Sequence, residues 1–326
     1  MKTKLIAGLL LGGILVYLSV RGIDFQDVAK NLQGIDGGYL LPVLILMAAM
    51  QWLRSVRWGI LLSPLEKVNQ LSLFSVSNVG FLAIMAIPAR LGELARPYLI
   101  TQHSRIAMSS ALGTIVVERI LDVLTVLLIA VFVLVLTPTP PWMSRASGLL
   151  LFAATVATLL LVLMILWRGA LEKKAEMLAG RLPEKYASGA LRLLRHFIDG
   201  FQAMADRRII LYASGLSLVI WLVDVLIIYL MFLSFHYQLP VTAAFVVMII
   251  LIVGIAIPAA PGFVGNWHYF CVLALTLYGI SKPDALSFAI VYHFLSLVIV
   301  VALGVASLPF NRFTLADLRR QMTQTR

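Results

Sequence analysis

The chain is built from apolar blocks, several of which approach or exceed the roughly 20 residues that an α-helix needs to cross a bilayer core. Hydrophobic residues make up 61% of the 326 residues and charged residues only 13%, whereas about a quarter is charged in a typical soluble chain. We therefore predict an all-α polytopic membrane protein with a single transmembrane domain over residues 1–326. The blocks cover residues 5–20, 39–62, 71–89, 110–136, 147–167, 209–235, 241–260, 267–280 and 285–308.

Two polar stretches carry amphipathic helical patterns. Residues 22–37 place apolar side chains at helical spacing, which is typical of a helix lying on the membrane surface. Residues 168–208 show a second such pattern and are expected to form a cytoplasmic linker. The block at residues 5–20 follows a basic start, as a signal peptide does, but no small-residue cleavage site comes after it. We expect it to be an uncleaved first span.

The distribution of basic residues predicts the topology. A net charge of +11 would suggest a nucleic-acid partner in a soluble protein, but in a membrane protein it usually marks cytoplasmic loops that face anionic lipid. Nine Lys or Arg lie in residues 168–208, and four Arg lie after residue 311. The loops at residues 137–144 and 236–240 carry none. We expect a bacterial inner-membrane protein with both termini in the cytoplasm and no nucleic-acid partner.

Under this topology, residues 71–105 and 241–280 each begin and end on the same side of the membrane. The breaks contain Pro88 and Gly92 in the first region and Pro258, Pro261, Gly262 and Gly265 in the second. Broken backbone at membrane depth is tolerated where protein or a watery cavity surrounds it. We predict two re-entrant helical hairpins and about six full transmembrane helices. The alternative is that each region is an ordinary pair of short spans.

The two halves of the chain resemble each other weakly. Residues 86–92 (AIPARLG) align with residues 256–262 (AIPAAPG), and Trp52 and Trp221 precede these motifs at similar distances. Further along, the Glu118-Arg119 pair aligns with Tyr292-His293. We expect repeat one over residues 39–137 and repeat two over residues 209–308, in inverted orientation. Inverted repeats with broken helices are typical of transporters.

The densest polar cluster consists of Arg90, Glu93 and Arg96. On a helix these residues lie on adjoining turns, so Glu93 can bridge both guanidinium groups. Arginine offers planar, bidentate donors that suit phosphate. We interpret the cluster as a lipid head-group site at the neck of the first hairpin. The alternative is a solvated turn whose charges only mark the membrane interface.

A second cluster, Glu118, Arg119 and Asp122, lies within an apolar block, where charge is expensive and usually functional. Arg119 can reach Asp122 at i, i+3 spacing. The cluster is either part of the substrate site or a self-contained ion pair that fixes helix packing. Both interpretations hold if Glu118 pairs with Arg90 or Arg96. Arg54 and Arg57, near a helix end, are expected to extend towards the membrane interface.

The second half offers weaker substrate-binding candidates: Asn266, His268 and His293. A histidine within membrane helices more often donates a packing hydrogen bond than relays protons. Asp224, the acidic residue of its span, is expected to pair with an arginine of the first repeat. The sequence contains no nucleotide-binding loop, zinc-protease motif or nucleophilic-serine elbow. With one cysteine and five scattered histidines, we expect no metal, no cofactor and no enzymatic activity.

Several motifs together resemble a flippase-like family named for the transmembrane region of lysylphosphatidylglycerol synthetases. They are residues 54–58 (RSVRW), 88–97 (PARLGELARP), 117–122 (VERILD) and 258–265 (PAAPGFVG). The resemblance implies lipid translocation between leaflets, or service to a lipid-modifying enzyme. The family's usual acidic residue after the second Pro/Gly motif is replaced here by Asn266 or His268. The soluble aminoacyl-transfer domain is missing, so we expect no phospholipid aminoacylation by this chain.

These observations favour a flippase or scramblase-like transporter that binds an anionic lipid head group. A phospholipid, a polyprenyl-phosphate-linked sugar and a hopanoid all fit, and a lipid-modifying enzyme is a candidate partner. The alternative is a membrane-embedded lipid transferase, or an accessory subunit that presents a lipid-linked substrate. A small-molecule exporter is a third hypothesis. The lipid, the direction of transport, the energy coupling and the oligomeric state stay open.

Overall fold

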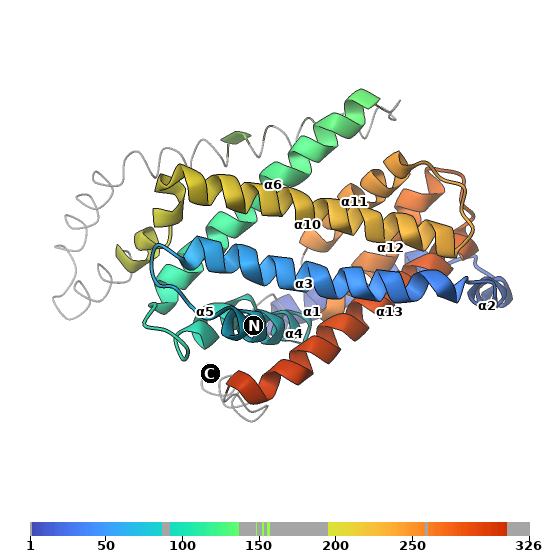
Figure 1. Ribbon diagram of the computed structural model, residues 1–326. Coiled ribbons are helices and arrows are strands. Elements are labelled where there is room, and N and C mark those ends of the chain that lie inside the picture. Colours follow the sequence, from blue (N-terminus) through green and yellow to red (C-terminus); the bar gives the residue numbers. More distant parts are fainter. Residues whose placement is uncertain are drawn as a thin grey trace. The chain divides into compact units, whose positions relative to one another are not determined.

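The computed structural model describes residues 2–86, 92–136, 195–257 and 260–311, together with positions 148, 152, 155 and 156. These residues form helices joined by short connections (Figure 1), and an all-α membrane protein is confirmed. The α-helices are α1 (Lys2–Val20), α2 (Phe25–Gln33), α3 (Leu40–Leu62), α4 (Gln70–Ala86), α5 (Ala95–Ile100), α6 (Met108–Leu136), α10 (Arg207–Ser234), α11 (Val241–Ala256), α12 (Asn266–Thr276) and α13 (Lys282–Ser307). Short 3₁₀ turns precede α3 (η1, Gly37–Tyr39), α10 (η3, Gln202–Ala205) and α12 (η4, Pro261–Phe263) and follow α13 (η5, Leu308–Asn311).

Three continuous helical stretches are long and apolar enough to cross a membrane: Gly37–Leu62, Arg207–Ser234 and Lys282–Asn311. Helix α6 is also long enough, at 29 residues, but it carries Glu118, Arg119 and Asp122. The predicted blocks at residues 39–62, 110–136, 209–235 and 285–308 therefore coincide with helices. The block at residues 147–167 lies almost entirely outside the described residues. The number of full crossings stays a prediction.

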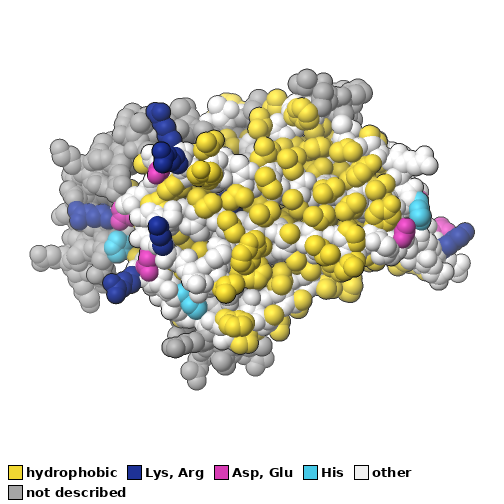
Figure 2. Space-filling model, viewed as in Figure 1, with side chains coloured by type: hydrophobic (Ala, Val, Ile, Leu, Met, Phe, Trp, Pro, Cys, Tyr) yellow, Lys and Arg dark blue, Asp and Glu magenta, His cyan; other side chains and the backbone are white. Residues whose placement is uncertain are grey.

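The surface of these helices is apolar. Leu41 and Ile45 on α3 and Leu211 and Tyr212 on α10 are each more than half exposed. Figure 2 shows hydrophobic side chains over the middle of this face and charged side chains towards the helix ends. Large contiguous apolar patches are rare on soluble monomers. Such a surface is suited to contact with lipid acyl chains.

Helix α2 is the predicted amphipathic helix of residues 22–37. The Asp24 side chain caps it by accepting a hydrogen bond from the Gln26 amide at 2.8 Å. The chain bends by 80° between α1 and α2. Asn31 of α2 donates to Asp284 at the start of α13. Helix α2 is thus a separate element, held against α13 and not a continuation of the first span.

The second Pro/Gly break separates α11 from α12, and α12 packs against α11, α13 and α1. Gly265 makes this break possible because its φ is +93° and a Cβ there would overlap Gly12 of α1. Only glycine adopts such a backbone readily and leaves room for a neighbouring main chain. Residues 241–276 therefore form a helical hairpin. Its re-entrant position in the bilayer stays a prediction.

The first break lies between α4 and α5, and Pro88 and Arg90 fall outside the described residues. After the break, Gly92 lies against the backbone of Ala83, and a Cβ at Gly92 would overlap it. The chain therefore turns back onto α4. Helix α5 has only 6 residues, against 17 in α4, so the second arm of this hairpin is short.

The chain divides into two compact units. One contains Met1–Leu53, Phe74–Arg96 and Ile220–Arg326, and the other contains Arg54–Leu73 and Pro97–Val219. In the second unit, α6 packs against the C-terminal part of α3 and the start of α10 through a core of small and branched side chains. This core comprises Leu61, Val117, Leu121, Phe201, Ala203 and Ala213. The repeat boundaries proposed above stay a prediction.

Candidate functional site

An arginine is buried near the end of α3, in the second unit. Arg57 lies five residues before Leu62, and its side chain is only 1% exposed. The expectation that Arg57 extends to the membrane interface is wrong. Its guanidinium instead faces acidic side chains on α6, and a charge buried among apolar helices is retained only when it is paired.

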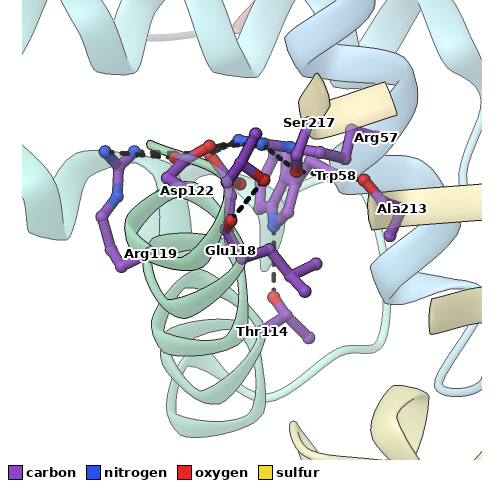
Figure 3. A network of polar contacts seen from close by, with 10 residues as sticks. Arg57, Trp58, Thr114, Glu118, Arg119, Asp122, Ala213 and Ser217 are labelled. Atoms are coloured by element: carbon purple, nitrogen blue, oxygen red, sulfur yellow. Dashed lines mark hydrogen bonds and ion pairs between the residues drawn. The ribbon is translucent and has the colours of Figure 1, made fainter. Parts of the chain in front are cut away.

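Arg57 holds two carboxylates and a hydroxyl from two other helices (Figure 3). It donates to both oxygens of Asp122, with Nη1–Oδ1 at 2.5 Å and Nη2–Oδ2 at 3.2 Å. The same guanidinium lies 3.2 Å from Glu118 Oε1 and donates to Ser217 Oγ of α10 at 2.6 Å. Bidentate arginine–carboxylate pairs combine strength with a fixed geometry. The network therefore joins α3, α6 and α10.

Arg119 completes the network on its outer side. It lies 3.3 Å from Glu118 Oε1 and 3.7 Å from Asp122 Oδ2, as the i, i+3 spacing predicts. Its side chain is 54% exposed, whereas that of Glu118 is 1% exposed. Among the described residues, two cations and two anions thus balance each other, which lowers the free-energy cost of placing each charge in the helix.

The cluster lies at the centre of α6. Asp122 is 14 residues from Met108 and 14 residues from Leu136. A single charge at the centre of a membrane helix costs about 3 kcal/mol on insertion scales. We therefore expect this charged cluster either to fix helix packing or to bind a ligand.

Neighbouring contacts fix the network in place. Trp58 is fully buried beside Arg57, and its indole Nε1 donates to Thr114 Oγ1 of α6 at 3.2 Å. Thr114 in turn donates to the Ala111 carbonyl at 2.8 Å. Since Thr114 lies one turn before Glu118, the Trp58 contact sets the register of α3 against α6.

The first predicted cluster is described only in part, because Arg90 lies outside the described residues. Arg96 is 2% exposed, and its guanidinium lies over the Phe81 ring, 5.4 Å from the centroid. Glu93 is half-buried. A bridge from Glu93 to both arginines stays a prediction. Glu118 pairs with Arg57 and Arg119, and its expected pairing with Arg90 or Arg96 stays a prediction.

The second-half candidates lie together in the first unit. Asn266 Nδ2 donates to the carbonyls of Gly254 at 2.8 Å and Ile257 at 2.9 Å. His293 Nε2 lies 2.8 Å from the Gly262 carbonyl, which can only accept. The Trp267 ring stacks on His293 at 4.9 Å, and the His268 ring meets His293 edge-on at 5.0 Å. The first turn of α12, which carries Asn266 and His268, therefore lies beside His293 of α13.

Asp224 of α10 accepts a hydrogen bond from the Tyr292 hydroxyl of α13 at 3.3 Å. The expected pairing of Asp224 with an arginine of the first repeat stays a prediction. In the repeat alignment Tyr292 corresponds to Glu118. A polar contact thus links the first and last spans in each predicted repeat, Arg57–Glu118 in one and Asp224–Tyr292 in the other. Within the described ranges, no three His, Cys, Asp or Glu side chains come together as a metal site.

A known protein family matches residues 5–304 of the chain, and it is described as the lysylphosphatidylglycerol synthase transmembrane region. The chain belongs to this family. A UPF0104 membrane protein of Methanothermobacter thermautotrophicus is 23% identical over 325 residues, which cover 95% of this chain and 96% of that protein. The glycosyltransferase AglD of Haloferax volcanii is 27% identical over 297 residues, which cover 81% of this chain but 47% of that enzyme.

The resemblance drawn from the sequence motifs is thereby confirmed. For this member of the lysylphosphatidylglycerol synthase membrane-region family, sequence reasoning selected Glu118, Arg119 and Asp122 but missed their partners Arg57 and Ser217. A signal for Arg57 was present, because RSVRW was one of the family-like motifs. The sequence held no signal for Ser217, because a serine in an apolar block is common and only the fold brings it to Arg57.

Proposed function

We propose that this protein moves lipids between the leaflets of the cytoplasmic membrane and binds an anionic head group at the Arg57–Glu118–Arg119–Asp122 network. One observation carries the proposal: Arg119 keeps a half-exposed guanidinium near the centre of a long apolar helix. A purely structural pair would be expected to bury both partners. A phosphate can approach Arg119 from its exposed side.

The rest of the network suits reversible binding. Arg57 holds Asp122 by two hydrogen bonds, so the carboxylates stay in place when Arg119 turns towards a phosphate. Arg119 then exchanges charge-assisted hydrogen bonds to carboxylate oxygens for similar hydrogen bonds to phosphate oxygens. The free-energy change of such an exchange is small, and a transport site must release its ligand as readily as it binds it.

The relatives support a role in lipid metabolism. The family takes its name from the membrane region of a lipid-modifying enzyme, and one relative is named a glycosyltransferase. The predicted inverted repeats and broken hairpins add to this support, because transporter sites lie where such repeats meet.

Reconstitution in liposomes tests the proposal. The purified protein is placed in vesicles with a fluorescent phospholipid, and the loss of inner-leaflet fluorescence to a membrane-impermeant reductant is measured. Removing charge-assisted hydrogen bonds with Arg119→Gln should slow translocation by about tenfold or more. Arg208→Gln, an exposed arginine at the start of α10, is the matched control and should leave the rate within a factor of about two of wild type. Wild-type rates for Arg119→Gln would exclude the site.

The second candidate is a membrane-embedded transferase or accessory subunit that presents a lipid-linked substrate. The observation in its favour is the match to 47% of a glycosyltransferase's length. Mass spectrometry of lipids from vesicles supplied with sugar or aminoacyl donors separates the two functions. A new lipid product that depends on the protein would favour the transferase, whereas translocation without any product favours the transporter.

A further inference from the structure

The N-terminus of α12 is an uncapped helix end within the α11–α12 hairpin. The residue before it is Gly265, which has no side chain, and no side-chain hydrogen bond caps the helix among the described residues. Asn266 is turned away, since its amide nitrogen donates to the carbonyls of Gly254 and Ile257 at the end of α11. The first backbone N–H groups of a helix have no intrahelical acceptor. Those of α12 are therefore available to a ligand.

An indole N–H lies at the same place. Trp267 is 8% exposed, and its Nε1 has no hydrogen-bond partner among the described residues. Helical side chains lean back towards the helix N-terminus, which for Trp267 is the side of the break. The stack on His293, whose Nε2 is 2.8 Å from the Gly262 carbonyl, holds the ring there. A buried donor without a partner is unfavourable, and a bound acceptor would remove that cost.

Among the described residues, the side chains of the first turn offer the Trp267 and His268 donors and one buried acceptor without a hydrogen-bond partner, Asn266 Oδ1. The half-buried His268 adds a ring nitrogen next to the first turn, within reach of His293. Neither arm of the hairpin contains an acidic residue: α11 reads VTAAFVVMIILIVGIA and α12 reads NWHYFCVLALT. The positive end of the helix dipole also favours an anion at this site. An anion with several acceptor oxygens fits this arrangement, and a phosphate has them.

We propose that the N-terminus of α12, together with Trp267 Nε1 and His268, binds the phosphate group of a lipid head group. The inference rests on the proposed lipid transport and deepens it by naming a second contact, made by neutral donors where Arg119 offers a full charge. Neutral donors bind phosphate without leaving an unpaired cation in the apolar hairpin when the lipid departs.

The test measures binding directly, by NMR of the tryptophan indole N–H groups in the full-length protein. The Trp267 resonance is identified as the cross-peak that Trp267→Phe removes. Micelles containing the protein are titrated with short-chain phosphatidylglycerol, with inorganic phosphate, and with the matching diacylglycerol that has no phosphate. We expect a saturable downfield shift of the Trp267 proton with phosphatidylglycerol and none with diacylglycerol.

Two variants distinguish the loss of the Trp267 indole N–H from a general effect on the fold. Trp267→Phe keeps an aromatic ring for the stack on His293 but removes the donor, so it should weaken phosphatidylglycerol binding by about tenfold. Trp52→Phe, at an exposed tryptophan of α3, is the control and should leave affinity unchanged. Equal affinities for both variants would overturn the inference, as would an equal shift with diacylglycerol.

The remaining outcomes distinguish a lipid phosphate from inorganic phosphate. They also separate the proposed α12 site from the proposed lipid transport. A shift with inorganic phosphate alone would overturn the lipid assignment. Translocation in liposomes without any Trp267 shift in the titration would overturn this site and leave the transport proposal standing. A saturable shift in a protein that moves no lipid would support the site and contradict transport.

Discussion

At the scale of single residues, the network on α6 is governed by charge balance. Arg57 and Arg119 carry two positive charges, and Glu118 and Asp122 carry two negative ones. Removing one partner of a buried ion pair leaves an uncompensated charge, whereas removing both partners can be nearly neutral. The two arginines also differ in role, because Arg57 is enclosed by three helices and Arg119 is half exposed. Arg57 should therefore govern stability and Arg119 should govern ligand binding.

Arg57→Met is expected to destabilise the protein by about 3 kcal/mol, the usual cost of breaking a buried pair. It leaves Glu118 and Asp122 to share Arg119, with a net charge of −1. The double variant Arg57→Met with Asp122→Asn restores neutrality around the Arg119–Glu118 pair. We predict that the double variant recovers part of the lost stability. Thermal unfolding in detergent, followed by the fluorescence of a thiol-reactive dye on Cys271, measures both.

Cys271 suits this measurement because it is fully buried and becomes reactive only when the helices separate. Arg208→Met, which removes an exposed arginine of the same unit, is the control and should leave the midpoint unchanged. A double variant less stable than Arg57→Met alone would contradict the charge-balance account. Additive effects of the two substitutions would contradict it as well, since residues in one network are expected to couple.

At the scale of helices, the α11–α12 hairpin depends on how closely α1 approaches its break. A Cβ at Gly12 of α1 would lie 2.9 Å from Ala260 Cβ and 3.1 Å from the Val264 carbonyl. Helix α12 also packs against α1. The first span is thus a structural support for the break, and not only a membrane anchor.

Two adjacent glycines of α1 test this contact. Gly12→Ala should lower the unfolding midpoint, because the extra methyl group meets Ala260 and a main-chain oxygen that cannot move away independently. Gly13→Ala has no atom within 4 Å of its new Cβ. It should therefore be neutral, or raise stability by up to about 1 kcal/mol through helix propensity. Equal midpoints for the two variants would show that α1 does not support the break.

The helices could be predicted from sequence and their partners could not. Apolar blocks such as residues 39–62 define α3 because lipid forces backbone hydrogen bonds within the segment. The same block holds Arg54 and Arg57, three residues apart, and nothing local says that Arg57 faces acidic side chains on α6. The free indole of Trp267 is also beyond sequence reasoning. Its role depends on Asn266 turning towards α11 and on the backbone at Gly265.

At the scale of the whole molecule, the two predicted repeats have the same order of parts. Each has a first span, a Pro/Gly-broken region and a last span, and in each a polar contact joins the first span to the last. The candidate ligand groups differ, with a guanidinium at Arg119 and neutral N–H donors at α12. A charged site and a neutral site can bind the same phosphate with different strength.

Cysteine accessibility tests whether the two broken regions are inverted relative to each other. Single cysteines replace Leu94, after the first break, and Val264, within the second, in a Cys271→Ala background. Both side chains are more than 40% exposed, so protein packing does not block a reagent there. With inverted hairpins, a membrane-impermeant maleimide should label the two sites from opposite sides of the membrane. Arg208→Cys in the basic linker and Gln238→Cys in the uncharged loop mark the two sides. Labelling of both breaks from one side would refute the inverted arrangement and remove one of the supports for transport.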